Sequence, residues 1–222
     1  MCSSDLQLAR DWAASRFGAD AAAPLGELLV RSPRAVLGGF YLGCYARTHG
    51  PWTPNTLWVR DDQVGGAAKL RELYDGCGGA AAIDEVAAEK ATAVAEVEAM
   101  QQLLQAADAG LADRTLAATV AAGLEYERTL LECFQSYVTG MFRWFAYQDG
   151  GLLDPALRAQ ATTDLERARL AWQAHQAAGL LPNAPTPFRD AGITAAIDGA
   201  LEGLATPLEQ ARVLPSAATR PR

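Results

Sequence analysis

The strongest helical signal in this chain is residues 113–147, DRTLAATVAAGLEYERTLLECFQSYVTGMFRWFAY. Its apolar residues recur at intervals of three, four and seven, which is the spacing of one face of an α-helix. The residues on this face are Val120, Leu124, Leu131, Phe134, Val138, Met141 and Phe145. A helix of about 35 residues is roughly 50 Å long at a rise of about 1.5 Å per residue. Because the face is close to a heptad seam, we predict that this rod packs against neighbouring helices at shallow angles.

Two more long helices are predicted on either side of this one. Residues 83–107 are rich in Ala, Glu, Gln and Leu, and their apolar positions lie on one face. After a turn at residues 149–151, Asp154 can cap a third helix that begins at Pro155 and continues through Ala178. Short connections between these helices favour antiparallel packing. We therefore predict an all-α fold, an antiparallel bundle of three long helices with shorter N-terminal helices and one long irregular loop.

The shorter elements precede the bundle. Gly18 ends a first helix, Asp20 can cap a second, and Ser32-Pro33 is expected to open a third. Proline and glycine residues then interrupt the helical pattern in residues 48–66, which we interpret as a loop. A short helix over residues 67–74 is predicted after it.

The chain is divided by these patterns into a series of segments. They are a non-native leader at 1–6, short helices and a tryptophan-rich loop at 7–79, the long-helix bundle at 80–179, and a proline-rich strap, a weak helix and a tail at 180–222. The leader is inferred because Met1 to Leu6 resemble translated sequencing-adapter DNA, whereas a helical pattern runs from Gln7. The alternative is an ordinary flexible start with a serine-aspartate cap. If the leader is non-native, we expect the chain to be a fragment that lacks an upstream part.

Composition places this chain among globular proteins, because 50% of its 222 residues are hydrophobic and 20% are charged. The formal net charge is -7, and basic residues such as Arg167 and Arg169 belong to no basic run. This balance argues against a nucleic-acid partner. No apolar run reaches the ~18 residues that cross a bilayer, so no membrane partner is expected either.

The cysteines, histidines and glutamates predict no metal site and no cofactor. No Cys-x-x-Cys pair occurs, and we expect reduced, partly buried thiols at Cys2, Cys44, Cys77 and Cys133. Neither His49 nor His175 follows a glutamate by three residues, as a di-iron site in a helical bundle requires. We interpret the glutamates of residues 83–107, together with Lys90, as a solvated acidic face. These glutamates are Glu85, Glu89, Glu96 and Glu98.

The loop at residues 48–66 holds the candidate substrate-binding residues, which are Trp52, Trp58, Arg60 and Asp61. A tryptophan ring offers a flat apolar surface to a sugar, while an arginine and an aspartate can hydrogen-bond its hydroxyl groups. Asp61 and Asp62 cannot form a catalytic carboxylate pair, because adjacent side chains in an extended segment point to opposite faces. The alternative is that both tryptophans pin the loop to the bundle.

Short motifs in this chain are similar to those of an enzyme family. They are Trp12-Ala13-Ala14-Ser15-Arg16-Phe17-Gly18, Ser32-Pro33-Arg34-Ala35-Val36, the tryptophan-rich loop and Ala88-Glu89-Lys90-Ala91. Together they resemble the C-terminal helical region of α-glucuronidase-like glycoside hydrolases, over about Gln7 to Ala178. The resemblance implies a region that packs on an N-terminal catalytic barrel and often contributes to dimerisation. It implies no catalytic residue here, because the family's catalytic acids lie in the barrel.

The resemblance leads to the predicted function, a helical accessory region of a carbohydrate-active enzyme. Its expected partners are the missing N-terminal catalytic domain and a carbohydrate at the loop. The alternative is a stand-alone helical interaction module or homodimer without catalytic activity. A third interpretation is a small-molecule pocket between helices, although its aromatic residues are more simply packing residues. The residues of that pocket are Tyr126, Tyr137, Arg143, Trp144 and Tyr147.

Overall fold

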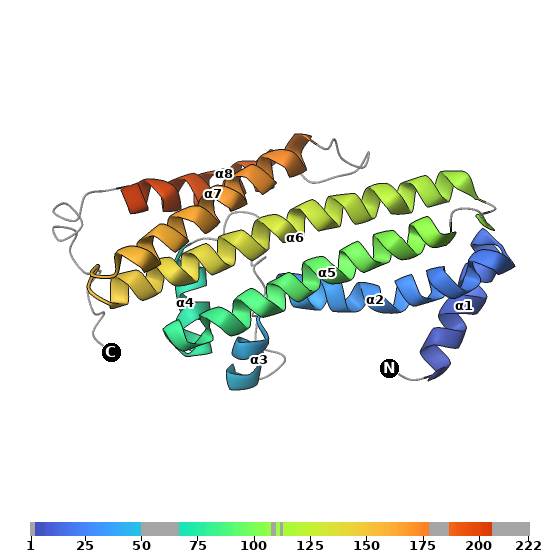
Figure 1. Ribbon diagram of the computed structural model, residues 1–222, viewed down its shortest axis with the longest axis horizontal. Coiled ribbons are helices and arrows are strands. Elements are labelled where there is room, and N and C mark those ends of the chain that lie inside the picture. The colour runs from blue at the N-terminus through green and yellow to red at the C-terminus, as the bar shows by residue number, and fades with distance from the viewer. Residues whose placement is uncertain (1–2, 50–66, 108–109, 112, 178–186, 206–222) are drawn as a thin grey trace.

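The structure of this protein is a computed structural model that describes residues 3–49, 67–107, 110–111, 113–177 and 187–205 (Figure 1). Helices make up nearly all of this part of the chain, and no strand occurs in it. The α-helices are α1 (Ser3–Phe17), α2 (Ala22–Phe40), α3 (Gly43–His49), α4 (Ala67–Cys77), α5 (Ile83–Ala107), α6 (Arg114–Asp149), α7 (Pro155–Ala177) and α8 (Pro187–Ala205). Short 3-10 turns, Ala19–Ala21 and Gly79–Ala82, precede α2 and α5. The all-α prediction is confirmed.

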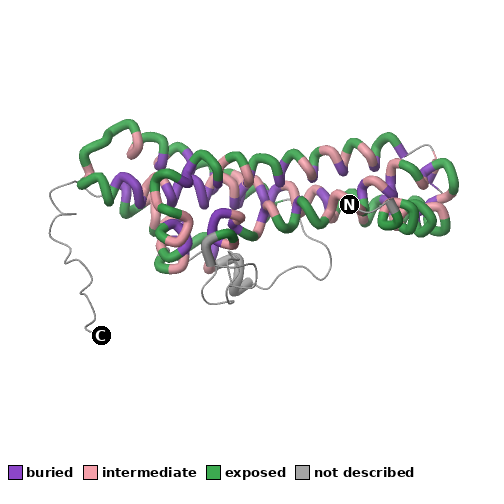
Figure 2. Tube along the Cα trace, turned by 90° about the horizontal axis from the view of Figure 1, so that it is seen from below, coloured by how far each residue is buried: buried purple, intermediate pink, exposed green. Residues whose placement is uncertain are grey.

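Helix α6 is shared by two hydrophobic cores. It packs against α5 on one side and against α7 on the other (Figure 1). The N-terminal core lies between α1, α2, α5 and the first half of α6, and it includes Leu25 and Val97. The C-terminal core lies between the second half of α6 and α3, α4, α7 and α8, and it includes Phe142 and Trp172. Figure 2 shows the buried residues along the inner sides of these helices and the exposed residues along their outer sides.

The apolar face predicted along α6 is the face that enters these cores. Its predicted residues are buried except Val120, which is partly buried against the N-terminal core. On another side of the same helix, Gly140 lies against α7. A Cβ atom built there would be 2.9 Å from Cγ of Leu165 and 3.2 Å from Cβ of Asp164. The lack of a side chain at Gly140 therefore lets α6 and α7 approach closely.

Helix α2 differs from the prediction that Ser32-Pro33 opens a separate helix. That prediction is wrong, because α2 continues through Pro33. Proline lacks the N–H group that would bond the carbonyl of Leu29, so it normally disfavours a helix interior. Pro33 is exposed, whereas the opposite side of α2 buries Leu28 and Ala35 in the N-terminal core. Burial of that side holds the helix together, and water can reach the carbonyl that proline leaves unbonded.

The bounds of the long helices agree closely with the predictions. Helix α5 begins at Ile83 and ends at Ala107, as expected from its sequence. Asp113 caps α6, because its side chain accepts a hydrogen bond of 2.8 Å from the N–H group of Leu116. A carboxylate in this position satisfies one of the amide groups that a helix start leaves unbonded.

The outer helices are longer than predicted. Helix α1 begins at Ser3 rather than Gln7. Helix α8, which corresponds to the weak helix predicted within residues 180–222, begins at Pro187, because the fixed φ of proline suits the first position of a helix. The rest of the predicted proline-rich strap lies outside the described residues.

Candidate functional site

The residues predicted to bind substrate are Trp52, Trp58, Arg60 and Asp61. They lie in residues 50–66, outside the part of the chain that the structure describes, so their role stays a prediction. The helices on either side of this segment, α3 and α4, are described. The polar groups around α3 are therefore described residues that lie close to this segment in the chain.

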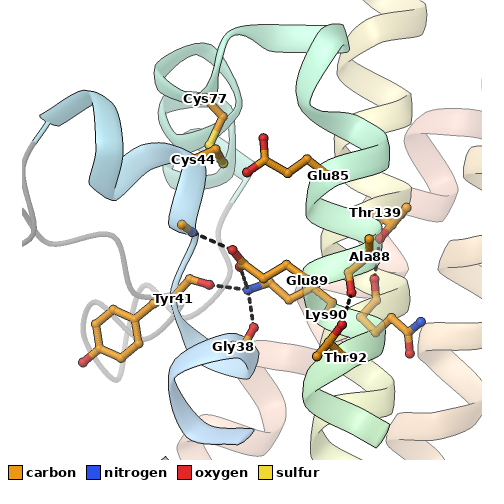
Figure 3. Close-up of polar contacts among 12 residues, drawn as sticks. Gly38, Tyr41, Cys44, Cys77, Glu85, Ala88, Glu89, Lys90, Thr92 and Thr139 are labelled. Carbon is orange, nitrogen blue, oxygen red and sulfur yellow. Dashed lines mark hydrogen bonds and ion pairs between the residues drawn. A yellow bond between two sulfur atoms is a disulfide. The ribbon is translucent and has the colours of Figure 1, made fainter. Parts of the chain in front are cut away.

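A buried lysine lies where α5 crosses the end of α2 (Figure 3). Only 1% of Lys90 is exposed. Its Nζ atom donates hydrogen bonds to the carbonyl oxygens of Gly38, at 2.6 Å, and Tyr41. It also lies 2.7 Å from Oε1 of Glu89. These contacts use all three donors of the ammonium group and bond carbonyls at the end of α2 that the helix itself leaves free.

The neighbouring Glu89 links the same cluster to α3. Its Oε2 atom accepts a hydrogen bond of 2.8 Å from the backbone N–H group of Gly43, the first residue of α3. A carboxylate is favourable at this end of a helix, because the unbonded amide groups carry a partial positive charge. Lys90 and Glu89 together therefore join the end of α2 and the start of α3 to the side of α5.

The electrostatic environment of Lys90 determines what its amine can do. Burial lowers the pKa of Lys90, and the adjacent Glu89 carboxylate opposes this effect. A lysine with a lowered pKa can serve as a nucleophile or base when substrate reaches it. Here carbonyl and carboxylate oxygens surround the nitrogen, and the side chain is not accessible from outside. This arrangement favours a positioning role for Lys90 over a catalytic one.

The interpretation of Lys90 and the glutamates of α5 as a solvated face is wrong for Lys90, which is buried. It is also wrong for Glu89 and for Glu96, which pairs with Arg31 at 2.9 Å and Arg34 at 3.7 Å. The partners come from α2, which the sequence of α5 does not reveal. A signal was nevertheless present, since Lys90 follows the buried Val86 by four residues and so falls on the core side of α5.

A disulfide lies beside the Lys90 cluster and corrects the prediction of reduced cysteines. Cys44, in the first turn of α3, is bonded to Cys77, the last residue of α4, with 5.0 Å between their Cα atoms. The spacing of the cysteines did not predict this bond, because it depends on how α3 packs against α4. Cys133 remains a free thiol, and burial raises its pKa to about 12.

Other contacts hold α3 between α4 and α5. The hydroxyl group of Tyr45 donates a hydrogen bond of 2.9 Å to Glu72 of α4. The ammonium group of Lys69 lies 5.8 Å from the centre of the Tyr45 ring. On the other side, Arg47 pairs with Glu85 of α5. Helix α3 is thus attached to both neighbours through short polar contacts.

The residues of the predicted small-molecule pocket all belong to α6 and lie in packing positions. The Tyr126 ring packs on the buried His175 at 4.4 Å between centroids. Arg143 forms an ion pair with the buried Asp164. The remaining tyrosines of that set, Tyr137 and Tyr147, are buried in the body of the protein. These contacts favour the packing interpretation.

Glu127 of α6 has an unusual environment. Its Oε1 atom is buried and has no hydrogen-bond partner among the residues that the structure describes. Burial raises the pKa of this carboxyl group, because the charged form loses solvation without gaining a partner. The charged form of Glu127 therefore weakens the folded state.

A groove of about 630 Å³ lies between α7 and the end of α8. Its apolar side is formed by Ala159, Leu201 and Leu204, and its charged residues are Arg158, Glu166 and Arg169. Arg158 donates a hydrogen bond of 2.6 Å to the carbonyl oxygen of Leu204. Because charges of both signs line the groove, its electrostatics select no single class of ligand.

One side of α2 exposes apolar residues. We call Leu29, Pro33, Val36 and Leu37 the α2 apolar face, and all of them are exposed. Residues separated by three, four, seven and eight positions lie on the same side of a helix. On α1, Leu8 and Trp12 are exposed as well. Contiguous exposed apolar surface is characteristic of interaction sites.

In the described residues, no group of three or more His, Cys, Asp or Glu side chains is arranged to hold a metal ion. Likewise, none of the helices placed by the structure combines the length and apolar character that membrane crossing requires.

Comparison of the chain with protein-family models, with curated proteins and with solved structures gave no match. The similarity to α-glucuronidase-like enzymes thus stays a hypothesis based on short motifs.

Proposed function

We propose that this chain is a non-catalytic helical docking module, in which another protein surface covers the α2 apolar face. The opposite side of α2 is already buried, with Leu25, Leu28 and Ala35 in the N-terminal core. A helix that is apolar on two sides is typical of an element that is buried on both. The α2 apolar face is the single observation that carries this proposal.

The similarity to α-glucuronidase-like enzymes supports one partner for this face, the catalytic domain of a carbohydrate-active enzyme. In this version, the α2 apolar face is the contact with the catalytic domain. The candidate binding residues then contribute to the rim of the substrate cleft; they are Trp52, Trp58, Arg60 and Asp61. The alternative partner is a second copy of the chain, which would make the protein a homodimer.

Sedimentation velocity of the purified chain over a wide range of concentration tests the docking proposal. We expect the chain to associate, because its apolar face has no partner, and we expect Leu37→Glu to abolish the association. Leu170→Glu is the matched control, since Leu37 is 59% exposed on α2 and Leu170 is 62% exposed on α7. If the chain forms a discrete dimer that Leu37→Glu abolishes, the partner is a second copy of the chain. If the chain forms aggregates of no fixed size that Leu37→Glu abolishes, the α2 apolar face is one that another protein covers. A monomer that stays monodisperse up to the solubility limit contradicts the proposal.

The carbohydrate role requires a separate experiment on a complete enzyme that contains this region. Alanine is substituted for each candidate residue: Trp52, Trp58, Arg60 and Asp61. If these residues contact the substrate, activity falls while the melting temperature stays the same. If they only pin the loop, the melting temperature falls and the activity of the folded fraction does not.

A further inference from the structure

The Cys44–Cys77 bond joins the short helix α3 to the end of α4, and the position of α3 depends strongly on its neighbours. Helix α3 has 7 residues, from Gly43 to His49. Helices of this length are unstable in isolation, because nucleation fixes several dihedral angles for few hydrogen bonds. The position of α3 therefore depends on its attachments to α4 and α5, of which the disulfide is the covalent one.

The other attachments of α3 are weaker than a covalent bond. Arg47 and Glu85 are largely exposed, and exposed ion pairs contribute little. The hydrogen bond from Gly43 to Glu89 and that from Tyr45 to Glu72 are single contacts. Without the disulfide, these contacts and the buried side chains of α3 are what keep it against its neighbours.

A large part of the fold lies outside the disulfide-bonded helices. The N-terminal core is formed by α1, α2, α5 and α6, and no residue of α3 or α4 belongs to it. The long contact between α6 and α7 also lies outside the disulfide-bonded helices. Loss of the bond is therefore expected to affect α3 and α4 while the long helices stay folded.

The two cysteine residues differ in their exposure. Cys44 is 4% exposed, whereas Cys77 is partly exposed and ends α4 just before Gly78, which has a φ of 99°. Thiol–disulfide exchange begins with attack of a thiolate on an accessible sulfur. The geometry favours attack on Cys77, with Cys44 as the leaving sulfur.

We propose that the Cys44–Cys77 pair is a redox-sensitive clasp that holds α3 against α4 when oxidised and releases it when reduced by a dithiol. A thiolate of the dithiol bonds to Sγ of Cys77, and Cys44 leaves as a thiolate that takes up a proton. The second thiol of the reductant then attacks the mixed disulfide, which frees Cys77 as a thiol. In total the protein disulfide gains two electrons and two protons, and the dithiol becomes a disulfide.

Peptide mapping and hydrogen exchange on the full chain test the clasp. The protein is compared in three forms, which are air-oxidised, treated with dithiothreitol in native buffer, and carrying the double substitution Cys44→Ser and Cys77→Ser. Mass spectrometry of alkylated, digested samples is expected to find a peptide pair linked through Cys44 and Cys77 only in the untreated wild type. Cys133 is the internal control and should resist alkylation in native buffer, because it is buried.

The expected result is a change confined to the clasped helices. Amide exchange in α3 and in the last turn of α4 should become at least ~10-fold faster after reduction, because the covalent link between the two helices no longer restrains their local opening. The double variant should show the same increase, oxidised glutathione should restore slow exchange in the wild type, and α6 should exchange at the same rate in every form.

Several outcomes would overturn the proposal. They are the absence of the linked peptide pair, a bond that dithiothreitol reduces only in denaturant, and unchanged exchange in α3 after reduction. Faster exchange in α6 as well would show that the bond maintains the whole fold, and this result would also exclude a local clasp.

Discussion

The Nζ atom of Lys90 lies 2.6 Å from the carbonyl oxygen of Gly38, which is 52 residues earlier in the chain. This bond joins the second turn of α5 to the last turn of α2. The adjacent Glu89 accepts a hydrogen bond from the backbone N–H group of Gly43, so the first residue of α3 is bonded to the same part of α5. The position of α3, and with it the sulfur of Cys44, therefore depends on a buried charge in α5.

Replacing Lys90 tests this arrangement. Lys90→Met should lower the free energy of unfolding by about 3 kcal/mol, because it leaves the carbonyl oxygens of Gly38 and Tyr41 without their ammonium donor and removes the ion pair with Glu89. Urea unfolding measures the change. Arg47→Met is the control, since the Arg47 side chain is 64% exposed and its ion pair should contribute less than about 1 kcal/mol. Equal losses in the two variants would contradict a structural role for the buried ammonium.

Glu127 gives a prediction with a defined pH dependence. Burial raises its folded-state pKa above the ordinary value of 4.5. The folded chain then binds the carboxyl proton of Glu127 more tightly than the unfolded chain does. The neutral carboxyl group therefore stabilises the fold fully below pH 4.5, and this stabilisation is lost as pH rises through the folded-state pKa. Glu127→Gln removes the charge and should raise the free energy of unfolding by about 1 kcal/mol near pH 7.

The same measurement in acid separates this effect from a general one. Urea unfolding at about pH 4 should show no gain for Glu127→Gln, because the wild-type carboxyl group is then neutral in the folded chain. The exposed Glu98, changed to Gln, should alter stability by less than about 0.5 kcal/mol at either pH. A gain from Glu127→Gln that is the same at both pH values would rule out titration as its cause.

Two glycines of α6 should respond in opposite directions to alanine. At Gly140 the new methyl group meets Leu165 and Asp164 of α7, so Gly140→Ala should destabilise the protein by about 1–3 kcal/mol. At Gly123 no atom of the described residues lies within 4 Å of the new Cβ, so Gly123→Ala should stabilise the protein by up to about 1 kcal/mol through helix propensity. Thermal unfolding of both variants gives the comparison. If both changes stabilise the protein, the close approach of α6 and α7 is wrong.

The ion pair between Arg143 and Asp164 offers a double-mutant test of α6–α7 packing. Arg143→Met should destabilise the protein by about 3 kcal/mol, because it leaves the buried carboxylate of Asp164 without its partner. Adding Asp164→Leu should recover most of this loss, since an apolar pair of similar volume needs no partner. Unfolding free energies of the single and double variants measure the coupling. A double variant that is less stable than Arg143→Met alone would contradict this account.

The candidate site could be predicted only in part. Trp52, Trp58, Arg60 and Asp61 were selected because aromatic and polar residues gather in one irregular segment, and their role stays a prediction. The sequence did not reveal the Cys44–Cys77 bond or the burial of Lys90. Both depend on contacts with residues far away in the chain, and no local spacing encodes such contacts.

Local sequence patterns predict the long helices and their apolar faces. Helix α5 has the bounds that its composition predicted, and α6 buries the face that its heptad-like spacing indicated. These features are local, because a helix and its periodicity depend on residues within a few positions of one another. Tertiary contacts, by contrast, make α2 continue through Pro33, bring Lys90 to the end of α2, and bring Cys44 to Cys77. In each case the free energy of burial and packing between distant segments outweighs the local preference of the residue.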